Sequence, residues 1–143
     1  MYTQLKERIK QHEGFRRTVY SDSLGFATIG YGHLVLPTDN FVEGVEYTKE
    51  ELDKVFDVDF EKAVNGAKEL IGNDSLLPQA EEVIIEMCFQ LGKTGVSKFK
   101  NMWAYLDDGD YVAAGDEMLD SNWYQQTPSR ALALSEIMKS CQL

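Results

Sequence analysis

Residues 13–33, EGFRRTVYSDSLGFATIGYGH, decide the fold of the N-terminal part of this chain. Residues 18–20 and 27–29 are mostly β-branched or aromatic, which is typical of strands. Between them, residues 21–25 combine Ser, Asp and Gly, the residue types that form tight turns. The stretch therefore predicts an antiparallel hairpin in a small sheet that spans residues 16–36.

The same stretch carries two acids and a hydroxyl, Glu13, Asp22 and Thr28, spaced nine and then six residues apart. Taken singly, each has an ordinary interpretation, because a Glu near a helix end is usually solvated and an Asp in a turn usually serves the turn. Taken together, with Gly30 and Gly32 leaving bare backbone beside them, the two acids can face each other across a cleft. Two facing carboxylates can break a glycosidic bond, since one gives a proton and the other activates water.

A first helix is predicted over residues 3–12, because Leu5, Ile9 and His12 fall on one stripe. A glycine follows and provides a stop signal, which places Glu13 at the helix C-terminus. The negative end of the helix dipole disfavours an ionised carboxylate there, so this position favours a protonated acid.

A long helix is predicted over residues 48–72, after a loop over residues 37–47. Thr48 and Glu51 have the spacing of a capping box at its start. About 24 residues make a rod roughly 36 Å long, which is long enough to join two lobes. Further helices are predicted over residues 78–90, 101–106 and 111–119, and from Pro128 onward with Thr127 as the N-cap.

The expected fold class is therefore α+β and mostly helical. A small N-terminal lobe of helix and sheet is joined by the long helix to a helical C-terminal lobe. We expect a single domain, residues 1–143, with lobes at about residues 1–58 and 73–143 and the linking helix at about residues 48–72.

The net charge of −10 restricts the partners. Residues 1–35 carry five Lys or Arg and three Asp or Glu, a net charge of +2, whereas residues 36–143 carry nine and twenty-one, a net charge of −12. An acidic protein repels nucleic acid and anionic lipid, so we expect neither nucleic-acid binding nor stable membrane association. No apolar run approaches the ~20 residues of a membrane helix, and the N-terminus lacks the apolar core of a signal peptide.

The cysteines and histidines predict neither a metal site nor a cofactor. Cys88 and Cys141 fall on predicted helices far apart in the sequence. We interpret them as buried thiols, with a disulfide as the alternative, because the chain shows no secretory signature. His12 and His33 lack the neighbouring ligands of a zinc site.

Three blocks of sequence resemble the phage-type lysozymes, in the T-even phage endolysin branch of glycoside hydrolase family twenty-four. The first is Glu13, Asp22 and residues 28–33, TIGYGH; the second is residues 87–96, MCFQLGKTGV; the third is residues 123–131, WYQQTPSRA. They occur in family order across nearly the whole chain. The resemblance implies a lysozyme-like fold, and cleavage of the β-1,4 bond between N-acetylmuramic acid and N-acetylglucosamine in bacterial peptidoglycan.

The resemblance also implies a role for each site residue. Glu13 would be the general acid, and Asp22 and Thr28 would hold the attacking water, with inversion at the anomeric carbon. Arg130 would pair with Glu13. His33 would pair with Asp59 in a structural rather than catalytic role. Substrate contacts are implied for Gly32, Leu34, Phe89, Gln90, Met102 and Glu117, with core packing as the alternative for Phe89.

The chain departs from the family pattern in three respects. It is acidic where the better-known relatives are basic. Met102 stands where the family has a small hydroxyl residue, and Glu117 stands where it has an amide. The binding roles of these two positions are therefore open.

The resemblance implies an endolysin that acts as a monomer on peptidoglycan at the end of a phage infection cycle. It would wait in the host cytoplasm and reach the periplasmic cell wall once a membrane pore, a holin, has opened. One alternative is a lytic transglycosylase, which uses a hydroxyl of the sugar in place of water and needs only the acid. Another is a virion-associated wall-binding or wall-degrading protein. The presence of Asp22 and Thr28 beside Glu13 favours hydrolysis over both.

Overall fold

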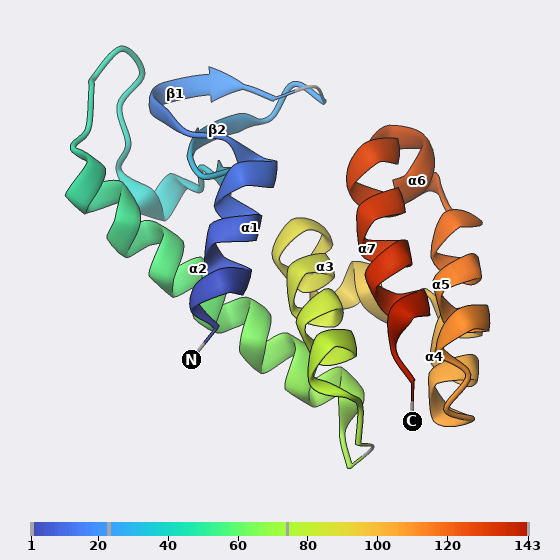
Figure 1. Ribbon diagram of the computed structural model, residues 1–143. Helices are drawn as coiled ribbons and strands as arrows, with labels where there is room; N and C mark the ends of the chain where they lie inside the picture. Colours follow the sequence, from blue (N-terminus) through green and yellow to red (C-terminus); the bar gives the residue numbers. More distant parts are fainter. Residues whose placement is uncertain (1, 23, 74, 143) are drawn as a thin grey trace. The chain divides into compact units, whose positions relative to one another are not determined.

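A computed structural model describes residues 2–22, 24–73 and 75–142, and its elements are labelled in Figure 1. By its internal contacts the chain divides into two compact units, Met1–Lys62 and Ala63–Leu143. The first unit holds α1 (Thr3–Glu13), β1 (Arg16–Ser21), β2 (Ala27–Gly30), β3 (His33–Leu34) and a short 3-10 helix (Pro37–Asp39). Helix α2 (Lys49–Ile71) carries the chain into the second unit, which holds α3 (Pro78–Ser97), α4 (Lys100–Asp107), α5 (Tyr111–Leu119), α6 (Asn122–Gln126) and α7 (Pro128–Ser140). The α+β, mostly helical fold class is confirmed.

The sheet of the first unit is antiparallel in the order β1-β2-β3. Tyr20 pairs with Thr28, and Ser21 pairs with Ala27, so the predicted hairpin is confirmed. Strand β3 adds a third strand, inside the predicted range of the sheet, by pairing His33 with Ile29. This register decides which side chains share a face, because opposed residues of an antiparallel pair point the same way.

The core of the first unit is formed by apolar side chains from α1, the sheet and α2. Leu5, Ile9 and Ile29 are fully buried, and the rings of Tyr31 and Phe56 pack edge to face with their centroids 5.4 Å apart. The expectation that His12 continues the buried stripe of α1 is wrong, since His12 is exposed. An imidazole loses more hydration on burial than Leu or Ile does.

The helices of the second unit approach closely where small residues allow it. Helix α5 packs against α7 and α4. A Cβ placed on Gly115 of α5 would come within 3.0 Å of the Ser135 carbonyl oxygen of α7, a tight contact that glycine avoids. The buried Ser135 hydroxyl donates to the Gly115 carbonyl at 2.7 Å, which satisfies its hydrogen bond inside the core.

The helix ends test the capping predictions. The Thr48 hydroxyl accepts from the Glu51 N–H at 3.1 Å and Glu51 accepts from the Thr48 N–H at 3.4 Å, so the capping box is confirmed. Thr127 occupies the N-cap position of α7, but its side chain makes no cap bond, contrary to prediction. Its hydroxyl accepts from Gln90 Nε2 at 3.2 Å and donates to the Trp123 carbonyl at 3.3 Å. Those partners, from α3 and α6, compete with the cap.

The helices of the second unit differ from the prediction at two places. Helix α6 was not predicted, and α3 runs past residue 90 with a break at Gly92, where φ is 78°.

Cys88 and Cys141 are free, buried thiols, as predicted, and burial raises the pKa of Cys88 to about 12. Within the described residues, no helix is both long enough and apolar enough to cross a membrane.

Candidate active site

Asp22 closes the turn between β1 and β2. The Gly25 N–H donates to the Asp22 carbonyl at 3.0 Å, and Gly25 has a φ of 87°, a left-handed conformation that favours glycine. The Asp22 side chain folds back over this turn, where Oδ1 accepts from the Leu24 N–H at 2.9 Å and the Phe26 N–H at 2.8 Å. Both bonds fall on one carboxylate oxygen. Among the described residues none falls on Oδ2, which leaves that oxygen to accept a proton from a ligand or water.

Thr28 is held by the same peptide that holds Asp22. Its hydroxyl donates to the Phe26 carbonyl at 2.9 Å, and the Asp22 N–H donates to that carbonyl at 2.9 Å. Thr28 is only 4% exposed, so packing fixes its rotamer. Since the hydroxyl proton is committed to the carbonyl, the oxygen faces any further partner as an acceptor.

Glu13 is the last residue of α1, and its carboxyl group lies against Gly32. A Cβ placed on Gly32 would come within 2.9 Å of Glu13 Cδ and 3.4 Å of Cγ. Gly32 has a φ of 72°, so both its backbone conformation and the space beside it favour glycine. The space that Gly32 leaves open beside its backbone is therefore filled by the side chain of Glu13, the candidate acid.

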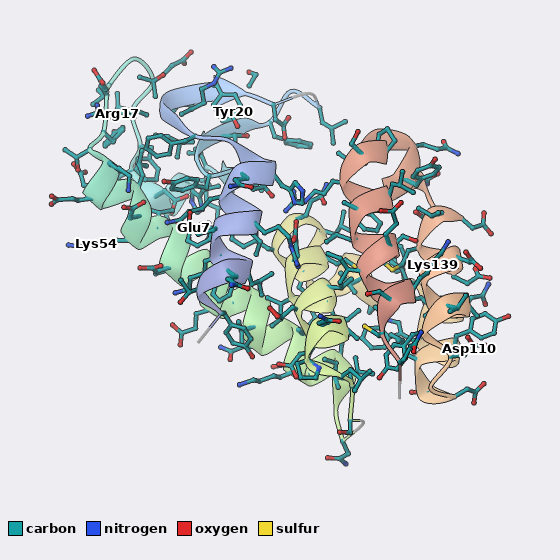
Figure 2. All side chains as sticks on the ribbon, viewed as in Figure 1. Glu7, Arg17, Tyr20, Lys54, Asp110 and Lys139 are labelled. Carbon is teal, nitrogen blue, oxygen red and sulfur yellow. The ribbon has the colours of Figure 1, made fainter. Side chains whose placement is uncertain are left out.

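The pKa of Tyr20 is raised by burial and by the charges of both candidate carboxylates, Glu13 and Asp22. Burial raises the pKa of this phenol, and the negative charges of Glu13 and Asp22 raise the pKa further, against a lowering by Arg16. Tyr20 lies on β1 (Figure 2), opposite Thr28 in the register. One hydroxyl is thus within electrostatic range of both predicted catalytic acids, and sequence reasoning did not single it out.

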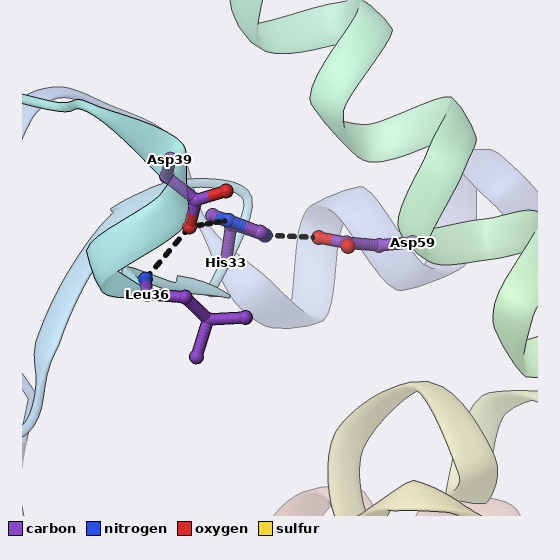
Figure 3. A network of polar contacts seen from close by, with 4 residues as sticks. All are labelled: His33, Leu36, Asp39 and Asp59. Atoms are coloured by element: carbon purple, nitrogen blue, oxygen red, sulfur yellow. Dashed lines mark hydrogen bonds and ion pairs between the residues drawn. The ribbon is translucent and has the colours of Figure 1, made fainter.

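His33 lies between two carboxylates (Figure 3). Its Nδ1 is 2.6 Å from Asp59 Oδ2, which confirms the predicted partner, and its Nε2 is 2.9 Å from Asp39 Oδ2. The hydrogen bond to Asp59 raises the pKa of His33 and outweighs the lowering by burial, and Asp39 raises the pKa further. Burial alone would raise the pKa of Asp39, but the Leu36 N–H and His33 lower it. These two contacts connect β3 to the 3-10 helix and to α2, which fits a structural role for His33.

Arg130 has a partner that sequence reasoning missed. Its Nε donates to Glu86 Oε2 at 2.9 Å, and Glu86 of α3 is fully buried. A Glu inside the apolar run from Val83 to Cys88 was the available signal, because a buried acid needs a cationic partner. The pairing of Arg130 with Glu13 stays a prediction.

Two of the predicted substrate contacts in the second unit, Met102 and Glu117, share a pocket. Met102 and Glu117 line one pocket of about 530 Å³, together with Lys98, Asn101 and Trp123. Met102 is buried in its wall, and Glu117 Oε2 accepts from Asn101 Nδ2 at 3.4 Å.

Of the remaining predicted contacts, Gln90 bonds at both ends of its amide. Its Oε1 accepts from Trp123 Nε1 at 2.9 Å, and its Nε2 donates to Thr127. Phe89 is half-buried, whereas Leu34 of β3 is 49% exposed. Roles in substrate binding for these residues, and for Gly32, stay predictions. Over the described residues, no three His, Cys, Asp or Glu side chains gather in a way that could hold a metal ion.

Comparison with known proteins places this chain in a family. The family model described as phage lysozyme matches residues 10–135. The chain is 27% identical over 158 residues to Probable T4-type lysozyme 2 of Dictyostelium discoideum, covering 92% of this chain and 91% of that protein.

Two phage proteins are similar over a part of their length. The chain is 29% identical to the Pre-baseplate central spike protein Gp5 of Enterobacteria phage T4, covering 94% of this chain but 27% of that protein. It is 28% identical to the Peptidoglycan hydrolase gp36 of Pseudomonas phage phiKMV, covering 93% of this chain and 15% of that protein. The match to the family model extends over most of the chain and includes Glu13, Asp22 and Thr28. The chain therefore belongs to the phage lysozyme family and is a glycosidase.

Proposed function

We propose that this enzyme hydrolyses the β-1,4 bond between N-acetylmuramic acid and N-acetylglucosamine in peptidoglycan. Glu13 acts as the general acid, Asp22 as the general base, and Thr28 positions the attacking water. The proposal is supported by membership of the phage lysozyme family and by the similarity to a peptidoglycan hydrolase. The observation that carries the mechanism is the main chain of Phe26, whose N–H donates to the Asp22 carboxylate and whose carbonyl accepts from the Thr28 hydroxyl.

The water site follows from the direction of these hydrogen bonds. Asp22 Oδ1 already accepts two N–H groups, so Oδ2 is the oxygen that would accept from water. The Thr28 hydroxyl donates its hydrogen bond to the Phe26 carbonyl, so the hydroxyl oxygen too would accept from water. A water that donates one proton to each of these oxygens points a lone pair away from both, toward an anomeric carbon in front of the hairpin.

The acid step follows from the position of Glu13 at the end of α1. The negative end of the helix dipole disfavours its carboxylate, and substrate that displaces water would favour the protonated form further. Glu13 gives its proton to the glycosidic oxygen as that bond breaks. The water oxygen bonds to the anomeric carbon, and the water proton passes to Asp22. This order inverts the anomeric centre and requires a carboxyl separation of about 6.5–9.5 Å in the enzyme–substrate complex.

The remaining roles belong to the same proposal. Arg130 orients Glu13, the His33 network holds β3, and Gly32, Leu34, Phe89, Gln90, Met102 and Glu117 contact substrate. We further propose a monomeric endolysin that resides in the host cytoplasm and reaches the periplasmic wall after the membrane is permeabilised.

The test is product analysis on purified peptidoglycan. We expect reducing ends on N-acetylmuramic acid, with the inverted anomer in fresh product. Glu13→Gln should abolish cleavage and keep wall binding, and Asp22→Asn should reduce cleavage severely with the fold intact. A 1,6-anhydro product would establish a lytic transglycosylase instead, and full activity in Glu13→Gln would show that another residue is the acid.

A further inference from the structure

An aromatic ring projects into solvent beside the catalytic pair of the proposed mechanism. Phe26 follows the β1–β2 turn and is 55% exposed, and its neighbour in the turn, Leu24, is 65% exposed. A large apolar side chain left in water at this place costs solvation that a buried position would recover. Among the described residues, no ring contact involves Phe26.

Main-chain hydrogen bonds place Phe26 against the Asp22 carboxylate. Tyr20 pairs with Thr28 and Ser21 pairs with Ala27, and beyond these pairs the Asp22 N–H donates to the Phe26 carbonyl at 2.9 Å. The Phe26 N–H in turn donates to Asp22 Oδ1 at 2.8 Å. The residue that carries the exposed ring is therefore in direct contact with the Asp22 carboxylate.

The main chain of Phe26 is fully used in holding the catalytic pair. Its N–H binds Asp22, and its carbonyl binds both the Asp22 N–H and the Thr28 hydroxyl. The ring position is thereby tied to the positions of Asp22 and Thr28. The side chain contributes nothing to those three bonds, so its role can be tested without breaking them.

We propose that the Phe26 ring is a platform on which a pyranose ring of the substrate stacks at the scissile bond. This rests on the proposed function and names a specificity-determining contact within that site. One face of a pyranose presents only C–H groups, which an aromatic face covers well, while the sugar hydroxyls at its edge stay free to bond polar groups.

Two observations favour a sugar over a lipid surface as the occupant. The Asp22 carboxylate binds the main-chain N–H of the residue that carries the ring, and burying that charge in lipid would be costly. The chain also carries a net charge of −10, which repels anionic lipid. A sugar, in contrast, offers the apolar face and the hydroxyl edge that the ring and the carboxylate together require.

The experiment compares Phe26→Ala, Phe26→Leu and Phe26→Tyr on a soluble glycan of alternating N-acetylglucosamine and N-acetylmuramic acid. We expect Phe26→Ala to raise KM about fivefold with kcat nearly unchanged, because about half of a Phe side chain loses its cover. Phe26→Tyr should restore the wild-type KM, and Phe26→Leu should fall between. Tyr105→Ala, which removes another exposed ring, should leave KM at the wild-type value.

A second measurement keeps binding separate from chemistry. In a Glu13→Gln background, Phe26→Trp places an indole at the platform, and titration with the same glycan should shift its fluorescence. The platform proposal would be refuted if Phe26→Ala kept the wild-type KM, or if the indole fluorescence stayed unchanged when the glycan was added. The proposed function fails on a different result, namely full activity in both Glu13→Gln and Asp22→Asn.

Discussion

Gly32→Ala should inactivate the enzyme while costing little stability. Gly32 has a φ of 72°, and a Cβ at this position would lie within 2.9 Å of Glu13 Cδ. The clash is with the end of a flexible side chain rather than with backbone. The added methyl group therefore moves the Glu13 carboxyl group and leaves the rest of the first unit in place.

The two costs can be estimated separately. An Ala in the left-handed conformation costs about 1–2 kcal/mol. For a chain of this size, that corresponds to a fall in Tm of roughly 2–8 °C. The effect on activity is larger, because a displacement of a catalytic group by about 1 Å can cost on the order of 100-fold in rate.

Gly44→Ala is the matched control. Gly44 lies in the same unit with a φ of 84°, and a Cβ there meets nothing within 4 Å. Both variants should lose the same stability in thermal unfolding followed by circular dichroism, and only Gly32→Ala should lose the release of reducing ends from purified peptidoglycan. Cleavage by Gly32→Ala at the rate of Gly44→Ala would refute the placement of Glu13 as the acid held against Gly32.

The remaining predictions concern the charged and buried groups. His33 has a pKa raised above its ordinary 6.5, so the stability that Asp59 confers is fully present below about pH 6.5 and is lost as the pH rises through the raised pKa. Asp59→Asn should cost about 1–3 kcal/mol at pH 6 and less at pH 9 in urea unfolding, and an equal cost at both values would contradict the ion pair. Glu86→Gln removes the carboxylate from the Arg130 guanidinium and should cost about 3–5 kcal/mol, whereas a loss under about 1 kcal/mol would show that water compensates the pair. Cys88 should resist alkylation at pH 8 in the folded enzyme and react once urea unfolds it, because burial disfavours its thiolate.

Local sequence signals were sufficient where the interacting groups are close along the chain. The Asp22 turn, the capping box of Thr48 and Glu51 and the bounds of α2 depend on residues within a few positions of each other. The failure at Thr127 shows the limit of such signals. Its N-cap pattern is sound locally, but Gln90, distant in sequence, binds the hydroxyl instead.

The amino-acid order alone was enough to indicate most of the secondary structure and the acid-turn-hydroxyl motif, because both are encoded in short-range periodicity and spacing. The resemblance of three sequence blocks was enough to indicate the family. Only the folded chain decided that Asp39 joins Asp59 on His33, that Glu86 binds Arg130, and that the main chain of Phe26 holds both Asp22 and Thr28. Those contacts depend on distance and direction in space, and charges or hydrogen-bonding groups far apart in the chain meet only after their elements have packed.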